Sequence, residues 1–301
     1  MKKVYVVEYP AFAGKWIYEG FAKAWAHLGF EVVRYEGSPP SESNFEEYYV
    51  MAADSSLSLE HQNLIAGSLG TYIFAQPATF PEPWGRHPNF VCGAHHEVVA
   101  MLNEQPNAHM WSWLDDKKFH TQWGNVNTMP LAFDSLSYEK LKDERYSVLD
   151  VCYVGGWANN GFDEKRKIMK DTFSAFNESG LKCAFFINKN VNHEQETKLI
   201  YNSKVALNVH DAYQRKLGLD TNERTFKALG LNGILVSDYV SQISRLFPEI
   251  KMSSSPKQMV EIVSEYCNMH ADDRNEIKAK NRQLIEEKHT YIRRVEELLN
   301  L

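Results

Sequence analysis

The segment Asn222-Glu-Arg-Thr-Phe-Lys-Ala-Leu229, followed by Gly233-Ile-Leu-Val-Ser-Asp238, carries the clearest structural pattern of the chain. A polar run, then an amphipathic turn, a glycine and a short apolar run are typical of a helix that leads into a buried strand of a parallel sheet. The start of such a helix favours anions, because its first backbone N–H groups have no partner within the helix. The segment therefore predicts an α/β fold with an anion position at this helix start.

The same alternation of strands and helices extends outward through the second half. Long apolar strands with helices between them predict a parallel sheet that is covered on both faces. The last helix is expected to be long, charged and amphipathic. The expected strands cover residues 147–153, 182–187, 205–208 and 234–237, and the expected helices cover residues 164–177, 193–202, 222–229, 240–246, 256–270 and 274–299.

The first half shows a second alternation. Between the halves, at residues 127–134, the pattern loosens around a proline and is followed by a charged stretch, which suits a domain boundary. We therefore expect an N-terminal domain of residues 1–134, a C-terminal domain of residues 135–285 and a C-terminal helix of residues 286–301 that packs back on the N-terminal domain. Strands are expected at residues 3–8, 31–35, 48–53, 71–75, 89–93 and 110–114, and helices at residues 16–27 and 59–67.

Composition narrows the class of protein. With 301 residues, 44% hydrophobic and 24% charged, the chain is typical of a globular protein of two domains. No apolar run reaches the roughly 18 residues of a membrane span, and the spacing of the four cysteines predicts neither disulfides nor a zinc site. We therefore expect a cytoplasmic protein. The net charge of −6 argues against a dedicated duplex binder, whose affinity depends on Lys and Arg contacts to phosphate.

Two strand ends in the second half carry groups suited to a ligand. Gly155-Gly156 follows an apolar run, and glycines let backbone N–H groups approach an anion. An ordinary βα turn needs the same glycines for geometric reasons alone. The next polar strand end carries Asn208 and His210, at the edge where open α/β sheets bind ligands. A single histidine is, however, more often a structural hydrogen-bonding group.

The helix start at residue 222 adds two cations. Arg224 and Lys227 lie three positions apart on one helix face, and an arginine can pair with a diphosphate through two parallel hydrogen bonds. An exposed turn of Glu, Lys and Arg is the alternative interpretation. Because three strand ends converge on one position, we favour an anion site.

The first half contains two candidates for a general base. His95-His96-Glu97 follows one expected strand, and Asp115-Asp116 follows the aromatic strand at residues 110–114. Adjacent histidines on a strand point to opposite faces, so His95 and His96 are poorly placed to chelate one metal. The sequence Asp115-Asp-Lys-Lys118 is also compatible with a solvated turn. No metal-binding motif stands out.

With these residues, the second half resembles the GT-B glycosyltransferases, and among them the CgeB-like group of the spore maturation protein type. The resemblance covers about residues 127–301. It implies two Rossmann-like βαβ domains that face each other across a cleft. Residues 149–156 are also similar to the donor-domain entrance of the bacteriophage DNA β-glucosyltransferases. The matching features, in order, are the Gly155-Gly156 loop, Ser203-Lys-Val-Ala-Leu-Asn-Val-His210, residues 222–229 before Gly233, and the tail His289-Thr-Tyr-Ile-Arg-Arg294.

The resemblance implies that Gly155 and Gly156 approach a nucleotide-sugar donor and that Arg224 contacts its diphosphate. The group usually has a glutamate after the phenylalanine, where it holds the ribose hydroxyls, but this chain has Lys227. A lysine cannot accept hydrogen bonds, so the identity of the nucleotide is left open. The donor-binding residues implied are Gly155, Gly156, Lys165, Asn208, His210, Asn222, Arg224, Phe226 and Lys227.

We therefore expect a glycosyltransferase that uses a nucleotide-diphosphate sugar, with a UDP-sugar the first expectation. No metal or other cofactor is needed if the helix start and Arg224, with Lys165 or Lys227, neutralise the leaving diphosphate. The phage resemblance implies Asp115 as the base, with His95 as the substitute.

The acceptor and the stereochemistry of transfer are left open by the sequence. A glycan, a protein, a small molecule and modified DNA are all compatible acceptors. Two other functions are also compatible with the pattern. One is a GT-B-like protein that binds a nucleotide or glycan without transferring a sugar, and the other is a nucleotide-sugar epimerase on the same fold.

Overall fold

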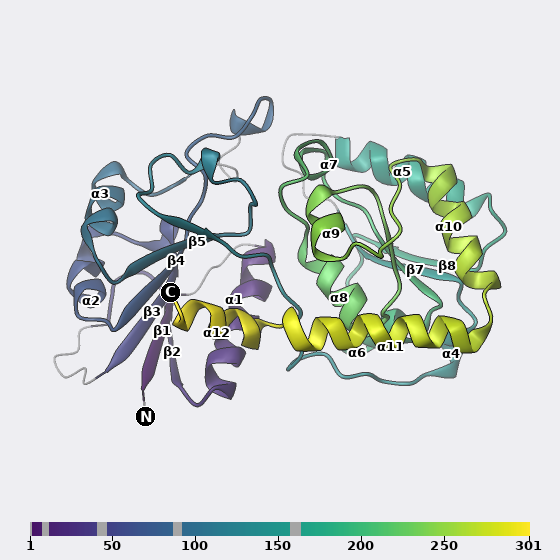
Figure 1. Ribbon diagram of the computed structural model, residues 1–301, viewed down its shortest axis with the longest axis horizontal. Helices are drawn as coiled ribbons and strands as arrows, with labels where there is room; N and C mark the ends of the chain where they lie inside the picture. Colours follow the sequence, from purple (N-terminus) through teal and green to yellow (C-terminus); the bar gives the residue numbers. More distant parts are fainter. Residues whose placement is uncertain (1, 8–11, 41–46, 87–91, 157–163) are drawn as a thin grey trace. The chain divides into compact units, whose positions relative to one another are not determined.

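The computed structural model describes residues 2–7, 12–40, 47–86, 92–156 and 164–301. The chain divides into two compact units. Unit 1 contains Met1–Pro130 and Tyr291–Leu301, and unit 2 contains Leu131–Thr290. Figure 1 shows that each unit has its own sheet with helices packed against it. Among the described residues, no helix combines the length and the apolar character that a membrane crossing requires.

Unit 1 is built on a parallel sheet of six strands in the order β2-β1-β3-β4-β5-β6. Strands β3 and β4 are almost wholly buried, as expected of parallel strands that are covered on both faces. The core beside them holds Ile65, Ile73 and Leu102. The strands are β1 (Lys3–Val7), β2 (Glu31–Tyr35), β3 (Tyr48–Ala53), β4 (Gly70–Phe74), β5 (Ala108–Ser112) and β6 (Val126–Thr128).

The C-terminal helix belongs to unit 1, although it is remote from the rest of the unit in sequence. Its Tyr291 packs against Phe21 of the first helix with ring centroids 4.9 Å apart, and the buried Arg294 donates from Nε to the Pro130 carbonyl at 2.8 Å. The α-helices of unit 1 are α1 (Phe12–His27), α2 (Gln62–Ala66), α3 (His96–Glu104) and α12 (Tyr291–Leu299), and its short 3-10 helices are η1 (Asp54–Ser56), η2 (Leu59–His61), η3 (Trp84–Arg86) and η5 (Lys117–Phe119).

Unit 2 has a parallel sheet of four strands in the order β10-β9-β7-β8. Side chains of α5 and α10, among them Phe173 and Val263, form one core with the strands. The strands are β7 (Val151–Gly155), β8 (Cys183–Ile187), β9 (Val205–Asn208) and β10 (Leu235–Ser237). The helices are α4 (Glu144–Ser147), α5 (Glu164–Asn177), α6 (His193–Asn202), α7 (Ala212–Leu217), α8 (Glu223–Leu231), α9 (Ser241–Leu246), α10 (Pro256–Asn268) and α11 (Ala271–Lys288).

Each sheet has one point at which the chain reverses the direction in which it adds strands. In unit 2 the second strand, β8, lies on one side of β7 and the third, β9, on the other. In unit 1 the same reversal occurs between β1 and β3. Open α/β sheets bind ligands outside the carboxyl ends of the strands at such a switch point. The fold of unit 2 therefore predicts a site at the ends of β7 and β9.

The expected α/β fold with two parallel sheets is confirmed, but several local elements differ. The single helix expected at residues 274–299 is wrong. His289 leaves the helical conformation (φ −131°, ψ 42°), its carbonyl accepts a 2.8 Å hydrogen bond from Phe133, and Thr290 forms a parallel bridge with Phe133. These contacts separate α11 from α12. Of the strand expected at residues 89–93, Cys92 and Gly93 are not in a strand, and residues 89–91 lie outside the described residues.

A lysine is buried between α11 and the sheet of unit 2. Lys278 donates from Nζ to the carbonyl of Ser203 at 2.6 Å, and burial lowers its pKa to about 7. Gly233 makes this packing possible, because a Cβ there would lie 2.3 Å from the Lys278 carbonyl oxygen. Asn232 donates to the same Ser203 carbonyl at 2.7 Å, so this oxygen keeps a partner without the lysine.

Replacing Lys278 should change how stability depends on pH. Its pKa falls from 10.5 in the unfolded chain to about 7 in the folded protein, so only the unfolded chain holds the proton between these values. The wild-type protein should therefore lose up to roughly 4 kcal/mol as the pH falls from 10.5 to 7. Urea unfolding of Lys278→Met should show a flatter profile and higher stability at pH 7. The exposed Lys280→Met on the same helix is the control, and identical pH profiles for both variants would contradict the assignment.

Candidate functional site

Arg224 joins the ends of the two strands that flank the switch point of unit 2. It is the second residue of α8, its Nε donates to the Val154 carbonyl of β7 at 2.9 Å, and its Nη1 donates to Asn208 Oδ1 of β9 at 3.1 Å. The guanidinium lies 5.0 Å from the centre of the Tyr153 ring. Two of its five N–H groups are engaged in these bonds, so three remain for a ligand as far as the described residues show. A fixed cation therefore stands at the predicted ligand position.

Glycine at position 155 allows this arrangement. A Cβ on Gly155 would lie 2.4 Å from Arg224 Nη2, so any larger residue would displace the guanidinium from the end of β7. A Cβ on Gly156 would lie 1.8 Å from Asn188 Oδ1 at the end of β8. With a larger residue at either position, the Arg224 or the Asn188 side chain would have to move from its present place. The loop that follows, residues 157–163 with Trp157, lies outside the described residues.

The start of α8 has no side-chain cap, although the backbone N–H of Thr225 donates to the Asn222 carbonyl at 3.1 Å. Asn222 precedes the helix, but its side chain makes no cap to the helix backbone. Its Oδ1 instead accepts a hydrogen bond from Asn208 Nδ2 at 2.9 Å. Uncapped N–H groups at a helix start attract anions. Asn222 therefore contributes to the site by supporting Asn208.

Lys165 supplies a second cation, from the start of α5. Its Nζ donates to the carbonyl of Val209 at 2.9 Å and lies 3.6 Å from Asp211 Oδ1. Burial lowers the pKa of Lys165, Asp211 opposes this, and the nearby Arg224 lowers it further. The lysine is thus held just beyond the end of β9, close enough to Arg224 for their charges to interact.

Asn208 and His210 are fully buried, so they support the site from below its surface. Asn208 Oδ1 holds Arg224, as described above. His210 Nδ1 lies 2.6 Å from Asp238 Oδ1, and its Nε2 lies 2.7 Å from Thr221 Oγ1. Thr221 and Asp238 were not predicted as site residues, although an aspartate directly after the strand 235–237 is a signal that the sequence contains.

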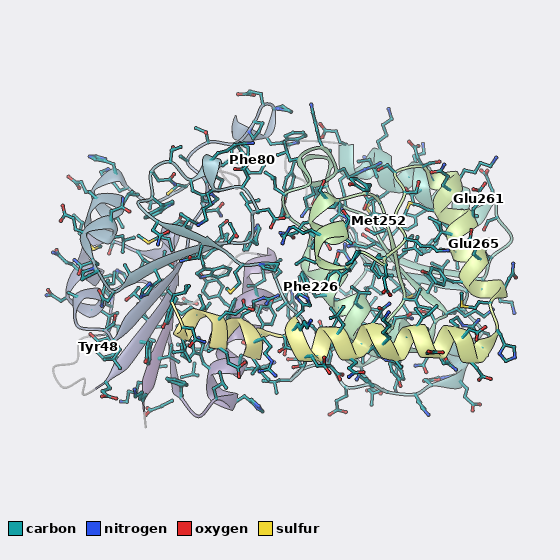
Figure 2. All side chains as sticks on the ribbon, in the orientation of Figure 1. Tyr48, Phe80, Phe226, Met252, Glu261 and Glu265 are labelled. Atoms are coloured by element: carbon teal, nitrogen blue, oxygen red, sulfur yellow. The ribbon has the colours of Figure 1, made fainter. Side chains whose placement is uncertain are left out.

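Phe226 lies apart from this cluster. The resemblance implies that it shapes the nucleotide site, but its ring is 0% exposed and packs against Phe247 and His289, with ring centroids 5.8 Å and 6.0 Å away. Figure 2 labels Phe226 on the ribbon of unit 2. Position 226 follows Arg224 by two residues, and a helix turns by about 200° over that distance, so the two side chains leave opposite sides of α8. Phe226 is therefore a core residue.

Lys227 faces α6, where its charge is paired. Its Nζ donates to Glu196 Oε1 at 2.7 Å and lies 5.5 Å from the centre of the Tyr138 ring. Burial alone would lower the pKa of Lys227, but Glu223 and Glu196 outweigh this effect and raise it. The side chains of Lys227 and Glu196 are 11% and 14% exposed. The ammonium is thus engaged in an interhelical ion pair, and Arg224 and Lys165 are the cations at the switch point.

The two candidate bases belong to unit 1. Asp115 is half-buried and follows the end of β5 by three residues. His95 occupies the N-cap position of α3 without a side-chain hydrogen bond to the helix, has 66% of its side chain exposed, and lies 3.5 Å from Glu97. His96 is the first residue of that helix, and the centroids of the two imidazole rings lie 4.5 Å apart. In the described part of the chain, no three His, Cys, Asp or Glu residues form a group that could hold a metal ion.

Unit 1 also contains a buried carboxyl group that the sequence analysis did not identify. Asp54 directly follows β3, beside the switch point of that sheet, and is 0% exposed. Its Oδ2 accepts a hydrogen bond from the Gln76 backbone at 2.6 Å. Burial raises the pKa of Asp54 to about 6. Its signal in the sequence is an aspartate at the end of an apolar strand.

Comparisons with known proteins agree with this architecture. Residues 152–300, which include the whole Arg224 cluster, match the model of a family described as glycosyl transferase-like. No curated protein matches the chain by sequence. Many solved structures match the chain, among them the following three.

T4 phage β-glucosyltransferase in complex with UDP-glucose aligns over 100% of both chains, with a TM-score of 0.57 and 11% identity. The N-terminal domain of Candida albicans trehalose-6-phosphate phosphatase aligns over 99% of this chain and 96% of its own, with a TM-score of 0.54 and 8% identity. A UDP-forming α,α-trehalose-phosphate synthase from Burkholderia vietnamiensis covers 84% and 72%, with a TM-score of 0.53 and 10% identity. At such identities the likeness shows the fold alone, which is of the GT-B type.

The ion pair between Lys227 and Glu196 should be structural. Lys227→Met leaves a largely buried carboxylate without its partner, so we expect a loss of about 2–3 kcal/mol in urea unfolding. Adding Glu196→Gln should restore at least half of that loss, because the largely buried Glu196 carboxylate is then removed. Lys198→Met is the control, since the partner of Lys198, Glu194, is 67% exposed and such pairs contribute little. If the loss of stability in the double variant equals the sum of the losses in the two single variants, the pairing is disproved.

Proposed function

We propose that this chain is a GT-B glycosyltransferase that transfers a sugar from a nucleoside-diphosphate sugar to an acceptor, and both the fold and the family match of residues 152–300 support this. The observation that supports this most directly is Arg224, whose guanidinium spans the ends of β7 and β9 at the switch point. An arginine with free N–H groups beside a helix start is suited to a diphosphate. The order of the motifs further supports membership of the CgeB-like group.

A UDP-sugar is the donor that we propose. Among the similar structures, T4 phage β-glucosyltransferase holds UDP-glucose, and the Burkholderia synthase is described as UDP-forming. The ribose of the donor needs a hydrogen-bond acceptor that Lys227 cannot provide. Glu196 and Glu223 are the carboxylates beside that lysine. We propose that one of these neighbours, instead of residue 227 itself, accepts the ribose hydroxyls.

In the proposed reaction an acceptor hydroxyl oxygen bonds to the anomeric carbon while the bond from that carbon to the diphosphate oxygen breaks. The diphosphate leaves with the bonding electrons, and Arg224, Lys165 and the start of α8 stabilise the charge that develops on it. The hydroxyl proton passes to a general base, for which Asp115 is the first candidate and His95 the second. The acceptor stays open between a glycan, a protein, a small molecule and modified DNA.

Arg224→Ala should weaken UDP binding about 100-fold by calorimetry, because a partly buried charge-assisted contact to phosphate is lost. Binding of uridine, which has no phosphate, should change little. Arg166→Ala is the control, since Arg166 is an exposed arginine on α5 of the same unit. Unchanged UDP affinity in Arg224→Ala would contradict the assignment of Arg224 to the diphosphate. If the wild-type protein releases no UDP from any UDP-sugar with any acceptor tested, the transferase proposal is wrong.

Transfer should also proceed without a divalent metal. Arg224 brings a permanent positive charge to the proposed diphosphate position and Lys165 lies nearby, so the two side chains can take the place of a metal ion as the electrophile. We therefore expect UDP release to keep more than about half of its rate when excess EDTA is added. A loss of activity that Mg²⁺ or Mn²⁺ restores would show that a metal takes part.

A further inference from the structure

A continuous chain of hydrogen bonds runs from Arg224 into the interior of unit 2. Asn208 Nδ2 donates to Thr225 Oγ1 at 2.9 Å, Thr225 Oγ1 lies 2.5 Å from Thr221 Oγ1, and Thr221 Oγ1 lies 2.7 Å from His210 Nε2. Apart from the guanidinium at its outer end, these side chains are at most 1% exposed. Solvent is therefore excluded from this chain of hydrogen bonds, and Arg224 is its one member that is not fully buried.

The direction of every bond follows from the two ends of the chain. Arg224 can only donate, so Asn208 must present Oδ1 to it and Nδ2 to Thr225 and Asn222. At the other end, Asp238 accepts from the His210 backbone at 3.0 Å and from Nδ1 at 2.6 Å, and Arg215 Nε lies 3.5 Å from its Oδ2. A carboxyl group surrounded by donors is ionised, so His210 Nδ1 carries the proton.

The two threonines then decide the state of His210. Each hydroxyl has one hydrogen to donate. If Nε2 is unprotonated, Thr225 donates to Thr221 and Thr221 donates to Nε2, and every hydrogen in the chain has an acceptor. If Nε2 carries a proton, both hydroxyls must reverse, and the hydrogen of Thr225 has no acceptor among the described residues. An unsatisfied buried donor is unfavourable, so the neutral Nδ1–H form fits the chain.

We propose that His210 is a positioning residue, which acts through Thr221, Thr225 and Asn208 to hold the Arg224 guanidinium across the switch point. It is 0% exposed, so its ring is not part of the surface that a ligand can reach. Without the acceptor at Nε2, the threonine hydroxyls lose their direction, and Asn208 Nδ2 loses its own contact with Nε2 at 3.3 Å. The bond to Asn222 then remains as the main restraint on a turn of the Asn208 amide. A turned amide presents its NH₂ group to Arg224, where two donors repel. The ligand in this inference rests on the proposed function, whereas the hydrogen-bond chain is a property of the protein alone.

The first test needs no ligand. In protein labelled with ¹⁵N-histidine, NMR of the side chain should show His210 as the neutral Nδ1–H tautomer at pH 7. Arg224 Nε–H, bonded to Val154, should exchange slowly with water in the wild type and at least about 10-fold faster in His210→Phe. An imidazolium, an Nε2–H tautomer, or unchanged exchange at Arg224 would each overturn the proposal.

The second test is a double-mutant cycle on UDP affinity. His210→Phe should weaken UDP binding about 10-fold in the wild type but less than about 2-fold in Arg224→Ala, because both changes remove the same contact. His210→Gln, whose amide oxygen can still accept from Thr221, should recover most of the affinity. Val236→Ala, a fully buried neighbour in β10, controls for lost stability and should leave UDP affinity unchanged.

The outcomes separate the two proposals. Additive effects of His210→Phe and Arg224→Ala would show that His210 does not act through the arginine. A wild-type protein that binds no UDP would remove the proposed function, and the exchange of Arg224 Nε–H would still decide whether His210 positions the guanidinium. If His210→Phe does not fold, Thr221→Val takes its place, because it removes the hydroxyl that joins His210 to Thr225. It should likewise speed exchange of Arg224 Nε–H, and unchanged exchange would overturn the proposal.

Discussion

The bond pair that Arg224 makes to β7 and β9 constrains most of what surrounds it. To reach the Val154 carbonyl, the guanidinium must lie against the end of β7, which leaves no room for a side chain at Gly155. To reach Asn208, it requires the amide to present its oxygen, and this sets the direction of the bonds behind it. Asn222 supports Asn208 instead of capping α8. The Arg224 guanidinium, which can only donate hydrogen bonds, thus restricts which residues fit at the ends of β7 and β9 and at the start of α8.

Positive charges in unit 2 serve different purposes that depend on their partners. Lys227 is one helical turn from Arg224, yet its ammonium pairs with Glu196 and joins α8 to α6. Lys278 is buried against a backbone carbonyl and has no role at the strand ends. Lys165 retains a place at the end of β9 beside Asp211. Chemical type alone therefore does not identify a phosphate ligand, since burial and the nearest carboxylate decide whether a cation remains available.

The fold is shared far more widely than these details. An identity of 11% with T4 phage β-glucosyltransferase over the full length of both chains shows that the GT-B arrangement tolerates nearly complete exchange of residues. Core positions require only apolar volume in a parallel sheet. The switch point requires particular groups, because charge and hydrogen-bond direction cannot be replaced by volume. The proposed function therefore rests on Arg224 and its neighbours, and the fold determines where these residues lie.

The sequence alone was sufficient for the α/β class, for most strands and helices, and for the polar residues at the ends of β7 and β9, because periodicity and strand-end composition are local properties. It did not reveal the break at His289–Thr290, the core position of Phe226, or the pairing of Lys227 with Glu196. It also did not connect His210 with Asp238, 28 residues further along the chain. Each of these depends on which side chain from a distant segment arrives opposite, and only the packed tertiary structure decides that.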